Sequence, residues 1–194
     1  VDLASVNSGV YEFIIGLALK ILLADRIIRV WVSGLYGINS IGIDSISTPL
    51  AWLGFFAFPL YLYFEFYGYS LMSRGIGRML GYGTPDNFLH PYMSRSVSEF
   101  WRRWHITLGE WFKENVYFPL GGSRCGKWGK VRNTFAIFLA SGLWHGANWN
   151  FVLWGLLYAV CLLAEKWIPA LQKLPAILRH GYVLLVVCIS FVIF

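Results

Sequence analysis

An all-α membrane protein with several transmembrane helices is the fold class that this sequence predicts. Hydrophobic residues make up 57% of the 194 residues and charged residues only 13%, whereas soluble domains usually carry about 25% charged residues. The mean hydropathy is +0.56, and 19% of the residues are aromatic. Aromatic rings concentrate where the hydrocarbon of a membrane meets the lipid headgroups. A soluble surface cannot be built from this composition.

The net charge of +6 has two readings. Basic residues interleaved with aromatic ones are typical of proteins that bind single-stranded nucleic acid. Here the basic residues fall in short loops between apolar runs, as the positive-inside rule predicts for a multi-pass membrane protein. We therefore expect a lipid membrane, and no nucleic acid, as a partner.

The ends of the sequence and its three cysteines lead to two further expectations. The sequence has no initiating methionine and stops inside an apolar run, so we expect an internal part of a longer protein, with one membrane-embedded core over residues 1–194. The cysteines show no metal-ligand spacing, and we expect neither a disulfide framework nor a metal site.

The first half of the chain contains two apolar segments with isolated charges. Residues 11–33 carry Lys20, Asp25 and two arginines, which favours a tilted or bundle-facing helix because charge inside a membrane is costly. Residues 51–69 are long enough to cross a hydrocarbon core of about 30 Å, and Glu65 is their one charge. Glu65 lies near the end of the run, so it is either a carboxylate at the membrane interface or a residue on a substrate path.

Residues 97–114 predict an amphipathic helix, either at the membrane interface or re-entrant within the bundle. On a helical wheel the charged residues fall within an arc of about 120°, and the large apolar residues occupy the opposite side. His105 lies at the boundary between these faces. Pro119 is expected to stop the helix, and residues 121–132 read as a basic loop.

A helical hairpin is predicted from two apolar segments, residues 133–145 and 150–165, joined at residues 146–149. Arg132 precedes the hairpin and Lys166 follows it, which indicates that the chain enters the membrane and returns. Thirteen residues of helix span about 20 Å, which places His145 past the middle of the core. Another span begins near Gly181.

His145 is the main candidate for chemistry. An imidazole at membrane depth needs polar partners that lipid does not supply, so it is a functional candidate, with a helix-to-helix hydrogen bond as the alternative. Ser141 and Gly142 lie one turn earlier and leave room for a substrate beside the ring. A neutral histidine can take a proton from an attacking hydroxyl. For His105, function and packing remain equally open, and no further ligand suggests a metal pair.

The sequence resembles the membrane-bound O-acyltransferase family over residues 11–167. The resemblance rests on five motifs in order: Tyr-Phe-Glu-Phe-Tyr-Gly-Tyr-Ser (63–70), Pro-Asp-Asn-Phe (85–88), Phe-Trp-Arg-Arg-Trp-His-Ile-Thr-Leu (100–108), Pro-Leu-Gly-Gly (119–122) and Leu-Trp-His-Gly-Ala-Asn-Trp-Asn-Phe (143–151). The branch that contains the membrane subunit of alginate O-acetyltransferase is the most similar.

The resemblance implies an enzyme of the bacterial cytoplasmic membrane that passes an acyl group, most simply acetyl, from a cytoplasmic thioester or acyl carrier to a hydroxyl of an extracytoplasmic polysaccharide. The thioester is a co-substrate, no tightly bound cofactor is expected, and a periplasmic or extracellular accessory acyltransferase is a possible partner. The family's catalytic histidine corresponds to His145, and His105 is its second hallmark.

We therefore predict that His145 and His105 are catalytic. Oxyanion stabilisation is expected from Asn148, the indole N–H of Trp144 or His105. The remaining predicted substrate-binding residues are Ser141, Trp104, Arg103 and Glu65. Three alternatives remain: D-alanyl transfer to teichoic acid, a transporter or flippase with Glu65, His105 and His145 along a polar path, and a structural scaffold.

Overall fold

A computed structural model describes residues 2–35 and 47–194 of the chain. The chain divides into two compact units, residues 1–85 and 86–194. The described residues are helical and form no β-strand, apart from one isolated antiparallel bridge between Phe88 and Trp104. This confirms the predicted all-α fold. The expectation of one core over residues 1–194 remains a prediction.

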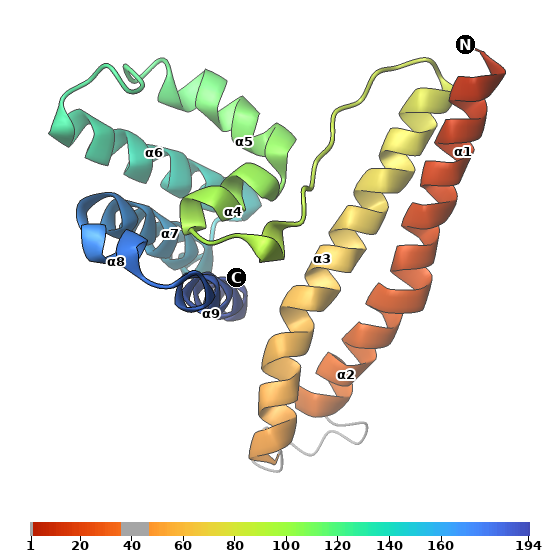
Figure 1. Cartoon of the computed structure of the whole chain (residues 1–194), viewed down its shortest axis with the longest axis horizontal. Coiled ribbons are helices and arrows are strands. Elements are labelled where there is room, and N and C mark those ends of the chain that lie inside the picture. Colours follow the sequence, from red (N-terminus) through yellow and green to blue (C-terminus); the bar gives the residue numbers. More distant parts are fainter. Residues whose placement is uncertain (1, 36–46) are drawn as a thin grey trace. The chain divides into compact units, whose positions relative to one another are not determined.

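The first unit is a pair of long helical segments that lie side by side (Figure 1). One segment runs through α1 (Leu3–Ala18), a π-helical segment (Leu19–Ala24) and α2 (Asp25–Leu35), and the other is α3 (Thr48–Met79). Gly9 and Gly16 of α1 face Gly75 and Gly68 of α3, and a Cβ atom on any of the four would collide with the backbone of the facing helix. Small residues therefore allow the two backbones to touch, as in membrane helix pairs.

Ion pairs involve several of the charges that interrupt the apolar sequence of the first unit. Glu12 accepts hydrogen bonds from Arg74, at 3.0 Å from Nε. The Nζ atom of Lys20 lies 2.9 Å from Asp25 and 3.0 Å from Glu65. These pairs join α1 and the π-helical segment to α3, so the carboxylates and cations lie beside one another between the helices rather than facing lipid singly.

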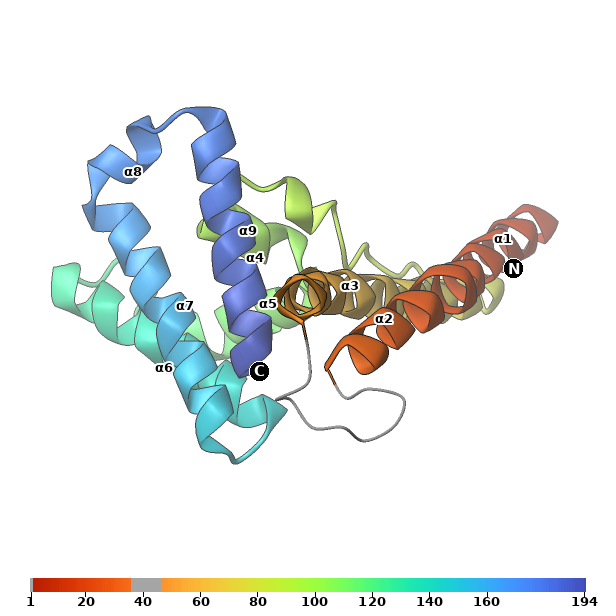
Figure 2. The same ribbon diagram turned by 90° about the horizontal axis from the view of Figure 1, so that it is seen from below.

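The second unit contains a short 3₁₀-helix (Pro91–Met93) and six α-helices within residues 86–194: α4 (Val97–Arg103), α5 (Ile106–Phe112), α6 (Lys127–His145), α7 (Trp149–Trp167), α8 (Pro169–Lys173) and α9 (Ala176–Ile193). A π-helical segment, Lys113–Tyr117, follows α5. α6 and α7 form the predicted hairpin, and α8 links α7 to α9 (Figure 2). The core of this unit is formed by Val97, Trp154, Tyr158 and Val186.

Three helices in the described part of the chain are long and apolar enough to cross a membrane, namely α3, α7 and α9. α6 is not among them, although its His145 was expected at depth. α6 also begins at Lys127, inside the segment that we predicted as a loop. Lysine and arginine are good helix formers, so the basic residues of this segment extend the first helix of the hairpin.

The expectation of one continuous amphipathic helix over residues 97–114 is wrong. The chain leaves the helix at Trp104, whose backbone is extended, and at His105, which adopts a left-handed conformation with φ 45° and ψ 55°. Residues 87–89 pack against this break: Leu89 N–H donates to the Arg103 carbonyl and Ile106 N–H donates to the Asn87 carbonyl, both at 3.0 Å. These backbone bonds replace bonds that a continuous helix would make.

Candidate functional site

His145 is the last residue of α6, at the turn of the α6–α7 hairpin. Two glycines hold this turn together. A Cβ atom on Gly142 would collide with the carbonyl oxygen of Phe151 in α7, and a Cβ atom on Gly146 would collide with the Phe151 ring. The sequence Gly-Leu-Trp-His-Gly therefore places the histidine about one turn after a close approach of the two helices.

Aromatic rings surround the half-buried imidazole of His145. The centroid of its ring lies 4.8 Å from that of Phe194, 4.9 Å from that of Trp144 and 5.3 Å from that of Trp154, each in an edge-to-face arrangement. Burial among these rings lowers the pKa of His145. The imidazole is therefore neutral at pH 7, the form that can accept a proton.

His105 is fixed by Asn87, which comes from the segment that breaks the amphipathic helix. Its Nδ1 atom lies 3.0 Å from Asn87 Oδ1. The same oxygen accepts hydrogen bonds from the backbone N–H and the hydroxyl of Thr107, at 3.3 and 3.0 Å. An oxygen that accepts from these two donors is also an acceptor for the imidazole, so Nδ1 carries the proton of neutral His105 and Nε2 carries the lone pair.

Electrostatics keep His105 neutral as well. Burial, with a smaller contribution from the charge of His145, lowers the pKa of His105 to about 4. The second cause implies that each histidine lies within the electrostatic range of the other. Two neutral imidazoles in one unit can each accept a proton, but because both are uncharged they do not provide the positive charge that would bind a carboxylate or phosphate.

The other residues predicted around His145 occupy three different settings. Ser141 is buried in α6, at 7% exposure. Trp144 is 59% exposed, with only part of its ring against His145. Asn148 caps α7, and its Oδ1 atom accepts the backbone N–H of Trp149 at 2.7 Å. The amide NH₂ of Asn148 is not used in this cap, so it keeps the donor that the prediction requires.

The residues predicted beside His105, and Glu65, have structural contacts. Trp104 is buried at 6% exposure and stacks on Phe100, with ring centroids 5.5 Å apart. Arg103 pairs with Glu99 at 2.6 Å on the same helix. Glu65 belongs to the first unit, where it pairs with Lys20. Their substrate-binding roles remain predictions.

The hydrogen bond to Asn87 bears on the role of His105. In the tautomer that donates Nδ1–H to Asn87, neutral His105 presents an acceptor nitrogen at Nε2. Its predicted catalytic role, with oxyanion stabilisation among the alternatives, remains a prediction. Sequence reasoning missed Asn87 because it precedes His105 by 18 residues, in a turn. The signal that could have identified Asn87 is the Pro-Asp-Asn-Phe motif, which was part of the family resemblance.

The described residues contain no group of three or more histidine, cysteine or carboxylate side chains placed to hold a metal ion. The chemistry that this arrangement can support is proton transfer by imidazole in an apolar setting. Two neutral histidines, set at helix ends in a helical membrane protein, define a class of candidate: a membrane enzyme that activates a hydroxyl or thiol.

Comparison with known proteins narrows this class. The model of the membrane-bound O-acyltransferase family matches residues 4–194, and the chain belongs to this family. A probable alginate O-acetylase, AlgI, of Pseudomonas syringae pv. tomato is 37% identical over 190 residues, which cover 97% of this chain and 36% of the relative. A second, from Azotobacter vinelandii, is 38% identical over 188 residues, 96% of this chain and 36% of the relative.

Relatives with other names also match the chain. A peptidoglycan O-acetyltransferase of Helicobacter pylori is 40% identical over 161 residues, which cover 81% of this chain and 29% of the relative. A teichoic acid D-alanyltransferase of Bacillus subtilis is 28% identical over 199 residues, 96% of this chain and 49% of the relative. The chain thus spans about a third of the length of the O-acetylating relatives that it matches.

Proposed function

We propose that the protein to which this chain belongs is a membrane O-acyltransferase that transfers an acetyl group from a thioester donor to a hydroxyl of a cell-surface polysaccharide. The observation that carries the proposal is His145, neutral at the end of α6 within an aromatic setting, in a member of this family. The names of the relatives support acetyl as the acyl group and a polymer as the acceptor.

The proposed mechanism uses His145 as the general base. Its unprotonated ring nitrogen takes the proton of the acceptor hydroxyl while the hydroxyl oxygen attacks the thioester carbonyl. The new C–O bond forms as the carbonyl oxygen becomes an oxyanion, and donors such as the amide of Asn148 or the indole of Trp144 stabilise that charge. When the intermediate collapses, the C–S bond breaks and the thiolate takes the proton from His145.

His105 has a separate role in this scheme. With its proton held on Nδ1 by Asn87, its Nε2 atom can accept a hydrogen bond from the incoming hydroxyl. A hydroxyl held in this way is oriented for attack. Fixing the orientation of a reactant can supply a large part of an enzyme's rate acceleration. We therefore assign orientation of the acceptor to His105 and proton removal to His145.

The partners follow from the same proposal. The donor is a cytoplasmic acyl thioester or acyl carrier, the acceptor is an extracytoplasmic polysaccharide, and the site lies in the bacterial cytoplasmic membrane. A periplasmic or extracellular accessory acyltransferase would act on the same polymer. D-alanyl transfer to teichoic acid is the second candidate, supported by the similarity to the Bacillus subtilis enzyme.

The experiment that tests the proposal measures ester-linked acyl groups on the surface polysaccharide of cells that carry the full-length gene. We expect His145→Ala to lower the rate of acyl transfer by about 10²- to 10⁴-fold, as for the loss of a general base, and so to remove most of the ester at an unchanged protein level. His90→Asn is the matched control, because His90 is exposed and left-handed, a conformation that asparagine tolerates.

Mild alkaline release identifies the acyl group. Acetate supports the proposal, and D-alanine favours the second candidate. Full ester content in His145→Ala cells would contradict the assigned base. Ester-free polymer in wild-type cells, together with substrate movement in vesicles, would favour the transporter.

A further inference from the structure

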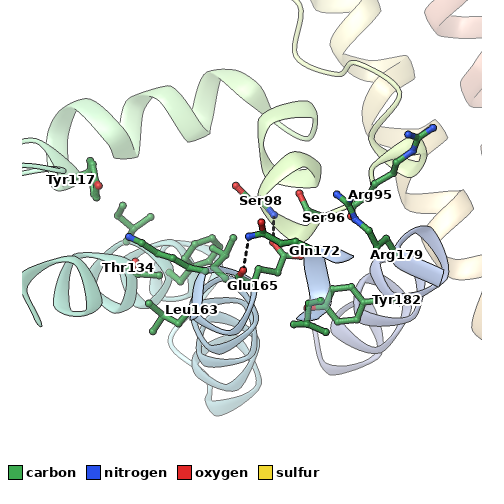
Figure 3. Close-up of a pocket in the computed structure, with 15 residues that line it drawn as sticks. Arg95, Ser96, Ser98, Tyr117, Thr134, Leu163, Glu165, Gln172, Arg179 and Tyr182 are labelled. Carbon is green, nitrogen blue, oxygen red and sulfur yellow. Dashed lines mark hydrogen bonds between the residues drawn. The ribbon is translucent and has the colours of Figure 1, made fainter. Parts of the chain in front are cut away.

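The second unit contains a cavity of about 700 Å³ that neither histidine lines (Figure 3). It is bounded by the start of α4, the middle of α6, the end of α7, α8 and the start of α9. Its volume falls within the range of about 300–1,000 Å³ that is typical of small-molecule sites. The cavity is therefore large enough for a ligand other than the reacting groups at His145.

Cations without a carboxylate partner line this cavity. Arg95, Lys166 and Arg179 all contribute to its wall, and within residues 2–35 and 47–194 no carboxylate forms an ion pair with any of them. Arg179 extends from α9 toward the start of α4 (Figure 3), where its Nε atom donates to the Arg95 carbonyl at 3.2 Å. This bond holds the guanidinium in place and leaves its two NH₂ groups available to a ligand.

The single carboxylate in the wall does not neutralise these cations. Glu165 is buried at 8% exposure, and its two oxygens accept the backbone N–H groups of the first two residues of α4. A carboxylate that is occupied by backbone donors stabilises the helix start. Because three cations and only this one carboxylate line the wall, the cavity keeps an excess of positive charge.

Apolar side chains form another part of the wall. Ile137 and Phe138 come from α6, and Leu162, Leu163 and Leu171 come from α7 and α8. A ligand that suits both parts has an anionic group for the arginines and a hydrocarbon portion for these side chains. Arginine is the side chain best matched to phosphate, because its planar fork can donate two parallel hydrogen bonds.

The position of the cavity along the chain indicates where such a ligand comes from. α7 and α9 are candidate membrane spans, and the cavity lies where α7 ends and α9 begins. Lys166, Lys173 and Arg179 cluster at these ends, as basic residues do at the level of the lipid headgroups. Basic pockets between membrane helices at this level suit the headgroups of anionic lipids.

We propose that this cavity binds an anionic phospholipid, with its phosphate on the Arg179 guanidinium, with Arg95 and Lys166 adding positive charge to the wall, and with an acyl chain along the leucines and Phe138. The site is separate from the proposed acyl transfer and does not depend on it. A phosphate is also present in the pantetheine arm of thioester donors, so the test distinguishes the two sources.

The test uses the purified full-length protein, stripped of lipid in a neutral detergent and titrated with dioctanoyl phosphatidylglycerol. We expect Arg179→Gln to raise the dissociation constant about tenfold, the effect of losing a hydrogen bond to a charged group. Lys173→Gln is the matched control: it removes the same charge from the same connection, but Lys173 does not line the cavity. We expect it to bind phosphatidylglycerol as the wild type does.

Three results would overturn the proposal. Equal losses in Arg179→Gln and Lys173→Gln would show general surface attraction, and equal affinity for dioctanoyl phosphatidylcholine would show that the anionic head is not recognised. Free coenzyme A that displaces the lipid and loses affinity in Arg179→Gln would assign the phosphate to a donor. If Arg179→Gln fails to fold, Lys166→Gln takes its place, because no described residue bonds to the Lys166 side chain.

Discussion

Asn87 offers the sharpest test of how the site is built, because one oxygen atom accepts three hydrogen bonds. These bonds come from His105 Nδ1, Thr107 N–H and the Thr107 hydroxyl, at 3.0, 3.3 and 3.0 Å. At a net value of about 1 kcal/mol for each bond, Asn87→Ala should lower the free energy of unfolding by about 3 kcal/mol. It should also release the ring of His105 and reduce acyl transfer.

Asn87→Asp separates the electrostatic effect from the structural one. The carboxylate keeps an acceptor at the same position and adds a negative charge next to His105, which raises the pKa of His105 from about 4 toward its ordinary value of about 6.5. Below its pKa, His105 is protonated and can no longer accept a hydrogen bond on Nε2. The acid limb of the activity profile should therefore move to higher pH, while activity at pH 8 is largely retained.

The assay is the rate of acyl transfer by the full-length protein from pH 4 to pH 8, together with the melting temperature in detergent. Thr134→Ala is a suitable stability control, because its hydroxyl bonds only to a carbonyl of its own helix, at 2.9 Å. An Asn87→Ala variant with wild-type stability and activity, or an Asn87→Asp profile that coincides with that of the wild type, would refute the reasoning.

Three further predictions concern packing and charge. Gly142→Leu should separate α6 from α7, abolish acyl transfer and alter the elution profile in size-exclusion chromatography. Gly181→Leu is the control, because a Cβ atom there meets nothing within 4 Å, and it should elute as the wild type does. Equal behaviour of the two variants would contradict the close approach of α6 and α7 at Gly142. Glu165→Gln should lower the melting temperature, since one of two charge-assisted hydrogen bonds to the start of α4 is lost. An unchanged melting temperature would show that these bonds do not stabilise α4. In a double-mutant cycle, Lys20→Met and Glu65→Gln should couple by about 0.5–3 kcal/mol, and additive effects would show that the pair is not formed.

The α6–α7 hairpin shows what a local pattern can predict. Two apolar runs with basic residues at both outer ends and Gly-Ala-Asn between them define the helices and the turn. The structure confirms both helices, with His145 at the turn. Prediction succeeds here because the determinants, helix length and a glycine at a close approach, lie within a few residues of the feature.

The break at His105 shows where a local pattern fails. The amphipathic period continues through residues 97–114, so nothing in the pattern itself ends the helix. The break comes from Asn87 and Leu89, whose hydrogen bonds to residues 103–107 replace the helical ones. A local hydrophobic period cannot predict the hydrogen-bond partners of a backbone group when those partners lie far away in the sequence.

Glu65 gives a second case of the same kind. From the sequence it was an isolated carboxylate at the end of a membrane span, with an interfacial or a substrate-path role. In the structure Lys20, 45 residues earlier, lies 3.0 Å from it and also contacts Asp25. Each charge looked costly when it was considered alone, and only the packing of α1 and α2 on α3 shows that the charges neutralise one another.

Both histidines lie at helix ends, and this placement sets two effects on their protonation against each other. The C-terminal end of a helix favours a cation by about 0.3–1 kcal/mol at exposed sites, which alone would raise the pKa of His145. Burial among aromatic rings acts in the opposite direction and lowers the pKa of His145. At His105 the left-handed backbone costs roughly 1–3 kcal/mol, and the three hydrogen bonds of Asn87 offset a cost of that size. The fold thus holds two neutral imidazoles under different constraints. At His145 the end of a helix favours the charged form, and at His105 the backbone is held in a costly left-handed conformation.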